Sequence, residues 1–561
     1  MWNFFVETLR ANPHIAVFFT LAVGYWVGNL RFGSFSLGAV TGTLLAGVLI
    51  GQLDIEVSAQ IKSIFFIMFL FAVGFGVGPQ FVRGIATDGA PQALFAALVC
   101  VLCLLVPFAA ATIAGYGPGL AAGLFAGSQT LSASIGLAEN AIRDSGIENA
   151  DAEITLIPVA YAITYLFGTI GTGWILAFLG PKMLGTNVEE ACKRYEREVL
   201  KGATKDGDYI SAWRARELRA YRVQEGGAAV GKRRDELESL AEGERIFVER
   251  LRRGGELVTP GDETALQAGD IVAVSGRREV LVSMFGKAEE VDDRELLDVP
   301  VESTDVLITS KAIDGKELIE IAKEPYTRGV YLNTIRRGSA AVNIPVAPGT
   351  KIYRGDILRV AGSKAHVAAF VEKIGYADRP QTITNMVLVG LAILIGGLIG
   401  AIVVPINGLP ITLSTSGGAL IAGIVAGWLR TVKPQIGNIP QPTLWFMNSV
   451  GLNVFIAVVG LSSGPTFVEG LKEAGFGLFF WGVVCTSIPM LLAPYIGKYI
   501  FKFDDAINLG VCGGARTSTA SVAMVGEVAK SDVPMLGYTV PYAVSNTLLT
   551  LWGLVIVLLV L

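Results

Sequence analysis

Arg516 is the residue whose chemistry is easiest to define, because it is a charged side chain within a long apolar run. A charge at membrane depth costs about 2.5 kcal/mol or more unless it is paired or hydrated. A guanidinium group binds a carboxylate through two parallel hydrogen bonds. A substrate carboxylate is therefore one candidate partner. The alternative is a position near the aqueous face, where Arg516 would reach water or pair with Asp504, Asp505 or Glu527.

Glycine and hydroxyl residues surround Arg516, and a similar segment around Gln129 occurs in the first half of the chain. Gly513 and Gly514 permit a break in a helix, and the hydroxyls after them can cap a new helix start, which attracts anions. For any single hydroxyl, the alternative is a hydrogen bond within its own helix. We predict that the two tips form one substrate pocket lined by Ser128, Gln129, Thr130, Ser132, Ser134, Gly514, Arg516, Thr517, Ser518, Thr519 and Ser521.

The charge of this predicted pocket limits its substrate. One fixed positive charge surrounded by neutral donors suits a small carboxylate or amino acid of net charge near −1 or 0. A substrate with two negative charges would need a second cation, or a proton or sodium ion carried with it. The sequence leaves these options open.

Composition places most of the 561 residues in lipid, because 52% are hydrophobic and the mean hydropathy is +0.54. The formal net charge of −4 argues against a nucleic-acid binder. Two histidines, five cysteines and the lack of a Walker A or GxGxxG motif predict no metal, no cofactor and no catalytic residues, so we do not expect an enzyme.

Apolar stretches of about 20 residues, the length that a bilayer requires, occur five times in each half of the chain. Glycine-rich segments at about 118–142 and 506–529 accompany them as broken or re-entrant helices. The predicted spans are at about 13–29, 36–53, 61–78, 90–115, 153–180, 382–404, 411–429, 444–463, 474–497 and 536–561.

The amino-acid sequences of the two halves also match. Gly42–Gly51 matches Gly418–Gly427, Gly74–Gly84 matches Gly460–Gly470, and Pro158 opens the last helix of its half as Pro541 does. Small-residue packing alone would not explain the shared order. In the second match, a Gly-Pro motif is expected to end each helix, with a role as hinge or close-packing site. These hinge or packing positions are Gly74, Gly78, Pro79, Gly460, Gly464 and Pro465.

An odd number of crossings gives the two halves opposite orientation, which is typical of secondary transporters. The fold class is therefore a polytopic α-helical membrane protein, an inverted repeat of five transmembrane helices plus a broken helix per half. Residues 181–380 hold 67 of the 94 charged residues and form a polar insert. The excess of Lys and Arg on the side of this insert predicts that it is cytosolic and that both termini lie outside.

The insert is itself duplicated. Each copy carries an Arg-Arg-Gly turn, at Arg252 and at Arg336, followed by Pro-Gly and Gly-Asp turns, and strand-like alternation begins near Val230 and near Asp305. This pattern resembles the TrkA-C (RCK-C) domain, a small α+β module. The predicted domains are a first membrane repeat (1–180), a linker with the first module (181–295), the second module (296–380) and the second membrane repeat (381–561).

Two membrane halves around tandem TrkA-C modules resemble the aspartate:alanine exchanger family of bacterial transporters. The resemblance implies an inner-membrane antiporter that exchanges aspartate for alanine by elevator-like alternating access, and we expect a homodimer. Alternatives are a succinate-type dicarboxylate exporter, a cation-coupled carboxylate transporter and a channel gated by the modules, for which the sequence shows no selectivity-filter motif. A small anionic effector at the Arg-Arg-Gly turns is a further expectation, against simple solvation of those charges.

Overall fold

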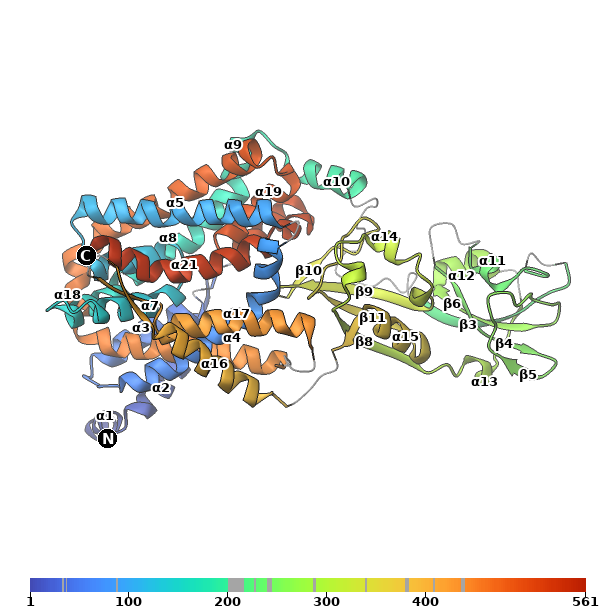
Figure 1. Ribbon diagram of the computed structural model, residues 1–561, viewed down its shortest axis with the longest axis horizontal. Helices are drawn as coiled ribbons and strands as arrows, with labels where there is room; N and C mark the ends of the chain where they lie inside the picture. The colour runs from blue at the N-terminus through green and yellow to red at the C-terminus, as the bar shows by residue number, and fades with distance from the viewer. Residues whose placement is uncertain are drawn as a thin grey trace. The chain divides into compact units, whose positions relative to one another are not determined.

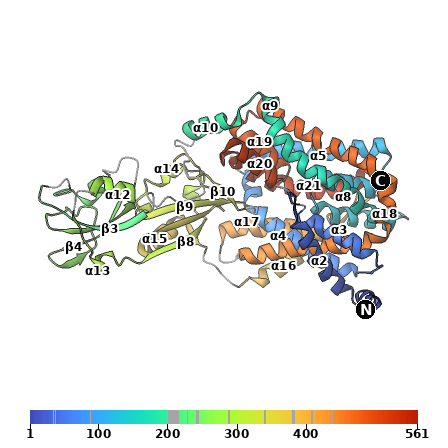
Figure 2. The same cartoon turned by 180° about the vertical axis from the view of Figure 1, so that it is seen from behind.

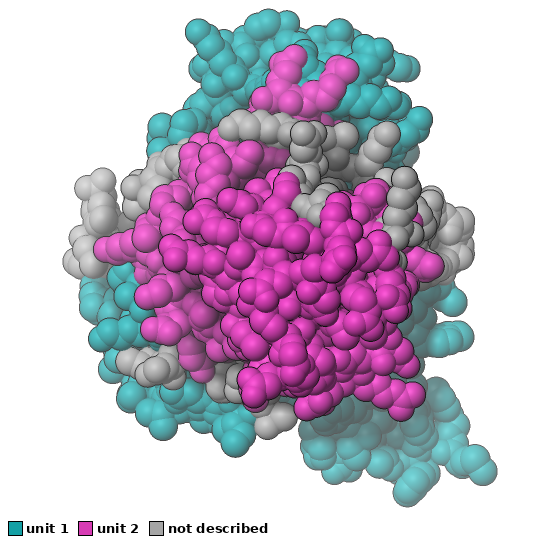
Figure 3. All heavy atoms as spheres, turned by 90° about the vertical axis from the view of Figure 1, so that its right-hand side faces the viewer, with its two compact units in different colours: residues 1–195, 336–344, 380–561 teal, residues 196–335, 345–379 magenta. Residues whose placement is uncertain are grey.

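The structure is a computed structural model that divides into two compact units, coloured separately in Figure 3. Unit 1 comprises residues 1–195, 336–344 and 380–561, and unit 2 comprises residues 196–335 and 345–379. The structure describes residues 1–32, 35–36, 38–86, 89–199, 216–226, 229–239, 245–285, 289–338, 341–378, 383–406, 409–434 and 439–561.

Unit 1 consists mainly of helices from both halves of the chain (Figure 1). The first half contains α1 (Trp2–Ala11), α2 (Pro13–Gly28), β1 (Arg31–Phe32), β2 (Phe35–Ser36), α3 (Ala39–Gly51), α4 (Ala59–Ala86), α5 (Ala90–Ala114), α6 (Pro118–Ser128), α7 (Ala133–Asp144), α8 (Ala150–Trp174), α9 (Gly180–Leu184) and α10 (Val188–Glu198). The second half contains α16 (Met386–Gly400), β13 (Val403–Ile406), β14 (Leu409–Thr412), α17 (Ser414–Val432), α18 (Gln441–Tyr495), α19 (Asp505–Ala515), α20 (Thr519–Ala529) and α21 (Thr539–Val560).

The order of elements repeats between the halves. A short β-hairpin follows the first membrane helix of each half, β1–β2 after α2 and β13–β14 after α16, a feature that hydropathy did not predict. Within the described residues, six helical segments are long and apolar enough to cross a membrane, and four shorter helices are apolar. In α16, Val387 and Leu398 leave 71% and 64% of their surface exposed. Such an exposed apolar face suits contact with lipid. The helical membrane fold is confirmed.

The Gly-Pro motifs do not end helices, so that expectation is wrong. Pro79 lies inside α4, and Pro465 lies inside α18, which runs continuously through both stretches predicted at 444–463 and 474–497. A proline removes one N–H group, and neighbouring groups in a membrane protein can satisfy the carbonyl that it frees. The glycines instead allow close packing: Gly78 touches the backbone of Ile424, and Gly464 touches the backbone of Gly51. Their role as hinges stays a prediction.

The helices of unit 1 pack as two groups (Figure 1 and Figure 2). We call α2, α3, α4, α16 and α17 the α4 group, and α5, α6, α7, α8, α19, α20 and α21 the hairpin group. The N-terminal part of α18 packs on the first group, where Asn453 hydrogen-bonds Thr43 and Tyr25. Its C-terminal part packs on the second, where Gly482 touches Thr164.

A buried ion pair joins the two groups. Lys62 Nζ of α4 lies 2.6 Å from Glu139 Oε2 of α7, and the two side chains are 18% and 5% exposed. Beside it, Asn140 lies within 3.5 Å of the hydroxyls of Ser414 and Ser416 in α17. A buried carboxylate without its cation would face a large desolvation cost, so this pair holds the groups in the observed arrangement.

Two copies of one small fold make up unit 2, except that residues 336–344 of the second copy belong to unit 1. The first has β3 (Arg216–Arg222), α11 (Arg234–Ser239), β4 (Phe247–Arg253), β5 (Glu256–Val258), β6 (Ile271–Arg277), α12 (Arg278–Phe285), β7 (Glu289–Glu290) and α13 (Arg294–Leu297). The second has β8 (Val301–Ile308), α14 (Leu318–Ile321), β9 (Val330–Arg337), β10 (Val342–Ile344), β11 (Ile357–Ser363), α15 (Lys364–Ile374) and β12 (Gly375–Ala377). The strand orders, β5-β4-β6-β3-β7 and β10-β9-β11-β8-β12, are equivalent, which confirms the two α+β modules.

Turn glycines set the shape of each module, as the sequence predicts. Gly269 and Gly355 have φ values of 88° and 90°, which favour glycine, and each precedes a buried aspartate. Asp270 and Asp356 accept hydrogen bonds from the backbone N–H groups three residues earlier. The first module begins earlier than expected, because β3 precedes the alternation near Val230.

Replacing Lys62 by Met should destabilise the protein, because Glu139 would be left buried and unpaired. Breaking a buried pair from one side costs about 3–5 kcal/mol. The double variant Lys62→Met with Glu139→Gln should recover most of this loss, because no charge remains. Thermal unfolding in detergent is the measurement. A wild-type midpoint for Lys62→Met alone would show that the pair does not hold the two groups together.

Candidate substrate site

Two helical hairpins, α6–α7 and α19–α20, occur at equivalent places in the two halves of unit 1. At their tips, Thr130 and Thr517 have φ values of 54° and 55°, left-handed conformations at equivalent positions. Two backbone hydrogen bonds of about 3 Å close each turn, Thr130 N–H to Gly127 O and Leu131 N–H to Ala126 O in the first, Thr517 N–H to Gly514 O and Ser518 N–H to Gly513 O in the second. The predicted broken helices are therefore present.

Glycines let each hairpin pack against the helix that follows it. A Cβ atom on Gly127 would collide with the carbonyl oxygen of Tyr161, and one on Gly514 would collide with that of Tyr538. Tyr161 and Tyr538 are thus structural counterparts. The sequence match of Pro158 with Pro541 is wrong in register, because Pro541 packs on Gly514 as Thr164 packs on Gly127.

A tyrosine hydroxyl contacts each tip. Ser132 Oγ lies 2.7 Å from the hydroxyl of Tyr161, and Thr519 Oγ1 lies 2.6 Å from that of Tyr538. Both tyrosines are buried, and each stacks at a tilt on a second tyrosine four residues later. The sequence reasoning missed these residues. The Tyr-x-x-x-Tyr spacing after each hairpin, at Tyr161 and at Tyr538, was the signal that could have found them.

The two tips meet through Arg516. Its side chain is fully buried, and Nη2 donates a hydrogen bond to the carbonyl oxygen of Ser128 in the other hairpin. Asp504 and Asp505 instead face Arg194 and Lys498, at 3.4 Å and 3.0 Å. The structure therefore contradicts the alternative in which Arg516 lies at the aqueous face and pairs with these aspartates.

Arg516 and Gln129 retain polar atoms that the protein does not satisfy. Among the residues that the structure describes, Arg516 Nε and Nη1 and Gln129 Oε1 have no hydrogen-bond partner. The Gln129 amide nitrogen donates to Cys485 O at 3.3 Å and to Ser128 Oγ at 3.2 Å. Buried polar groups are nearly always paired. The two unpaired Arg516 nitrogens could donate hydrogen bonds to a bound carboxylate, and the Gln129 oxygen could accept one from a donor group.

Several predicted hydroxyls bond within their own segment, as the alternative reading of the sequence allowed. Ser134 Oγ donates to Leu131 O at 2.7 Å, Ser128 Oγ to Phe125 O at 3.2 Å, and Thr517 Oγ1 to Arg516 O at 2.7 Å. Ser518 caps α20 and lies 2.6 Å from Ser521. These side chains shape the tips, and their contact with substrate stays a prediction.

Comparison of the chain with known protein families identifies related domains. Residues 16–180 and 388–558 match the family model described as a predicted permease membrane region, and residues 218–285 and 304–375 each match the TrkA-C domain. No solved structure matches the chain.

Among similar proteins, an uncharacterized transporter of Shewanella oneidensis is 49% identical over 99% of both chains. One of Bradyrhizobium diazoefficiens is 37% identical over 92% of this chain and 100% of its own length. One of Bordetella parapertussis is 35% identical over 98% of this chain and 97% of its own length. The chain therefore belongs to the aspartate:alanine exchanger family of permeases, multi-pass membrane transporters that here carry two TrkA-C domains between the halves of the membrane region.

Proposed function

We propose that this transporter is an antiporter of small carboxylates, most directly one that exchanges aspartate for alanine. The observation that carries the proposal is the buried Arg516, whose Nε and Nη1 have no hydrogen-bond partner among the described residues at the point where both hairpin tips meet. A carboxylate, common to both amino acids, would supply the missing acceptors.

The difference between the two substrates also fits the site. Aspartate carries a net charge of about −1 at neutral pH, and alanine about 0. Arg516 binds the shared carboxylate, while the neutral amide of Gln129 accommodates groups that differ. A succinate-type dicarboxylate would place two negative charges next to one guanidinium. Its second charge would need another cation in the site or an ion carried with the substrate.

Transport then requires both tips to change their exposure together. Since Arg516 of one hairpin donates to Ser128 of the other, the hairpins cannot part without opening the site from both sides. The hairpin group therefore moves as one body against the α4 group, with the Lys62–Glu139 pair as a contact that has to break. Assembly as a homodimer stays a prediction.

The proposed orientation has residues 181–380 in the cytosol and both termini outside the bacterial inner membrane. The Lys and Arg bias around the insert supports it. Under this orientation, the TrkA-C domains are exposed to cytosolic solutes. The site between the hairpins moves its own substrates across the membrane.

Substitution of Arg516 tests the site. Arg516→Lys should weaken binding through loss of the bidentate geometry, and Arg516→Gln should lower affinity about ten- to a hundredfold, because a charged hydrogen bond is lost. Gln129→Ala should cost less, since it removes a neutral amide rather than a charged group. The matched control is Thr20→Val, which changes a buried polar side chain in the α4 group. If calorimetry shows that folded Arg516→Gln protein binds aspartate with wild-type affinity, Arg516 is not part of the substrate site.

Exchange in proteoliposomes tests the substrates. Counterflow with labelled aspartate, alanine and succinate should show that aspartate and alanine exchange, and their exchange should respond to a clamped potential. One charge moves per cycle, and the field supplies about 2.3 kcal/mol per charge per 100 mV. Potential-independent exchange would indicate like-charged substrates or a compensating ion, and succinate counterflow alone would replace the proposed substrates.

Cysteine labelling tests the orientation. The five native cysteines are all buried, so background labelling should be low. Lys193→Cys and Leu561→Cys place thiols at exposed positions in α10 and at the C-terminus. In spheroplasts, an impermeant maleimide should label the second and not the first. Equal labelling of both positions would contradict the inverted repeat.

A further inference from the structure

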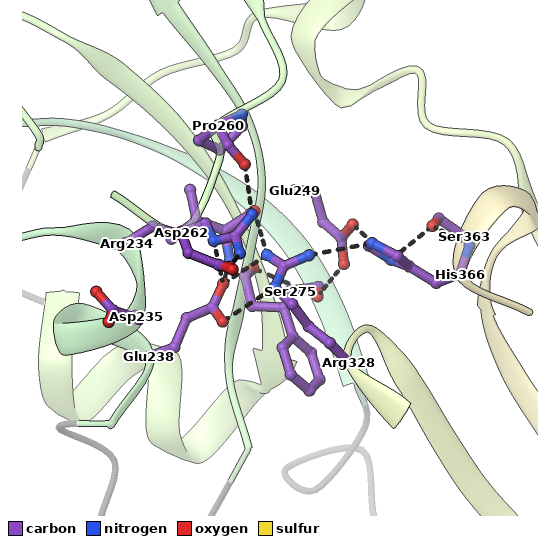
Figure 4. Close-up of polar contacts among 12 residues, drawn as sticks. Arg234, Asp235, Glu238, Glu249, Pro260, Asp262, Ser275, Arg328, Ser363 and His366 are labelled. Carbon is purple, nitrogen blue, oxygen red and sulfur yellow. Dashed lines mark hydrogen bonds and ion pairs between the residues drawn. The ribbon is translucent and has the colours of Figure 1, made fainter. Parts of the chain in front are cut away.

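A polar network joins the two modules of unit 2 (Figure 4). Arg328 of the second module donates through Nη2 to Glu238 Oε1 at 2.6 Å and to Val248 O at 2.8 Å in the first. Its guanidinium also lies 5.7 Å from the ring centre of Phe247. These contacts fix the position of a buried charge between the modules.

His366 extends the network, and the positive charges of the network affect its pKa. Arg328 Nη1 donates to His366 Nε2 at 3.0 Å, so the imidazole proton lies on Nδ1, 2.8 Å from Ser363 Oγ. Burial, followed by the nearby Arg328 and Arg234 charges, lowers the pKa of His366 to about 4. The ring is therefore neutral at pH 7, and the guanidinium groups dominate its surroundings although Glu249 lies 3.5 Å away.

A cavity of about 580 Å³ lies beside this network, between β4 of the first module and the start of α15 in the second. Its volume is within the range of sites for small organic ligands. The charged residues of its wall are Arg234, Glu249, Arg250, Arg328 and Lys364. Four cations and one carboxylate therefore face the same space.

Two of these cations have no carboxylate partner among the residues that the structure describes. Arg250 donates to the backbone carbonyls of Glu295 and Asp298, at 3.3 Å and 3.1 Å, and a carbonyl carries no net charge to offset its own. Lys364 is exposed in the first turn of α15, where the positive end of the helix dipole makes a cation unfavourable. A bound anion would offset the positive charge of Arg250 and the unfavourable interaction of Lys364 with the helix dipole.

The other two cations are already neutralised. Arg328 pairs with Glu238, and Arg234 pairs with Asp262. They shape the wall and, together with burial, lower the pKa of His366. The site therefore combines a polar wall with Arg250 and Lys364, two cations from different modules that have no carboxylate partner among the described residues.

The Arg-Arg-Gly turn of the first module, by contrast, has no spare charge. Arg252 binds Asp293 and Glu295, and Arg253 binds Asp270, at 2.6 to 3.0 Å. An anionic effector would have to break these ion pairs in order to bind there. These arginines stabilise the first module, and an effector at the Arg-Arg-Gly turns stays a prediction.

We propose that the cavity between the modules binds a small anion that carries two or more phosphate or carboxylate groups. Arg250 of the first module and Lys364 of the second hold its charges. Because the ligand bridges two modules, binding couples their orientation. The site is separate from the hairpin tips and independent of the transported substrate.

Calorimetric titration of the full-length protein in detergent, with pyrophosphate and with citrate as separate probes, tests the proposal. At least one probe should bind saturably. The double variant Arg250→Gln with Lys364→Gln should weaken that binding about tenfold or more, because two charged contacts are lost. The control is Lys373→Gln, an exposed lysine at the opposite end of α15, which should bind as the wild type does.

The two probes also separate the ligand classes. Binding of pyrophosphate alone assigns a phosphate-bearing ligand, and binding of citrate alone assigns a carboxylate-bearing one. Absence of saturable binding for both probes, or wild-type affinity in the double variant, would overturn the proposal. The single variant Lys364→Gln, exposed and outside the Arg328 network, repeats the test if the double variant unfolds.

Discussion

The burial of one guanidinium group away from water is the constraint on which the organisation of unit 1 depends. Arg516 is fully buried, so its hydrogen bonds must come from the protein or from a ligand. One bond goes to Ser128 of the opposite hairpin and brings the two tips together. The tight turns at Thr130 and Thr517 and the close approach of Gly127 and Gly514 to the next helices make that meeting possible.

Ion pairing also distinguishes the arginines of unit 2. Those at the first Arg-Arg-Gly turn and at the module interface have carboxylate partners and serve the fold. Arg250 and Lys364 have no carboxylate partner in the described part of the chain, and they face a shared cavity. The proposed substrate site at the hairpins and the proposed anion site between the TrkA-C domains would let the transporter respond to two different solutes.

Sequence reasoning succeeded where a local pattern controls the structure. The apolar spans, the glycine-rich broken helices and the Gly-Asp turns at Gly269 and Gly355 all follow from residues close together in the chain. It failed where the outcome depends on distant neighbours. Pro79 and Pro465 remain inside helices because the surrounding helices tolerate the lost hydrogen bond, and the repeat register near Pro541 depends on which residue packs against Gly514.

The sequence by itself determined the membrane class, the duplication of both the halves and the insert, and the family, because hydropathy and residue spacing are properties of the chain alone. Only the tertiary structure decided that Arg516 reaches Ser128 rather than Asp504 or Asp505, and that Tyr161 and Tyr538 support the tips. The tertiary structure also decided which cations of unit 2 have carboxylate partners, such as Arg328 with Glu238. Arg516 and Ser128 lie 388 residues apart in the chain, and only folding brings them within bonding distance.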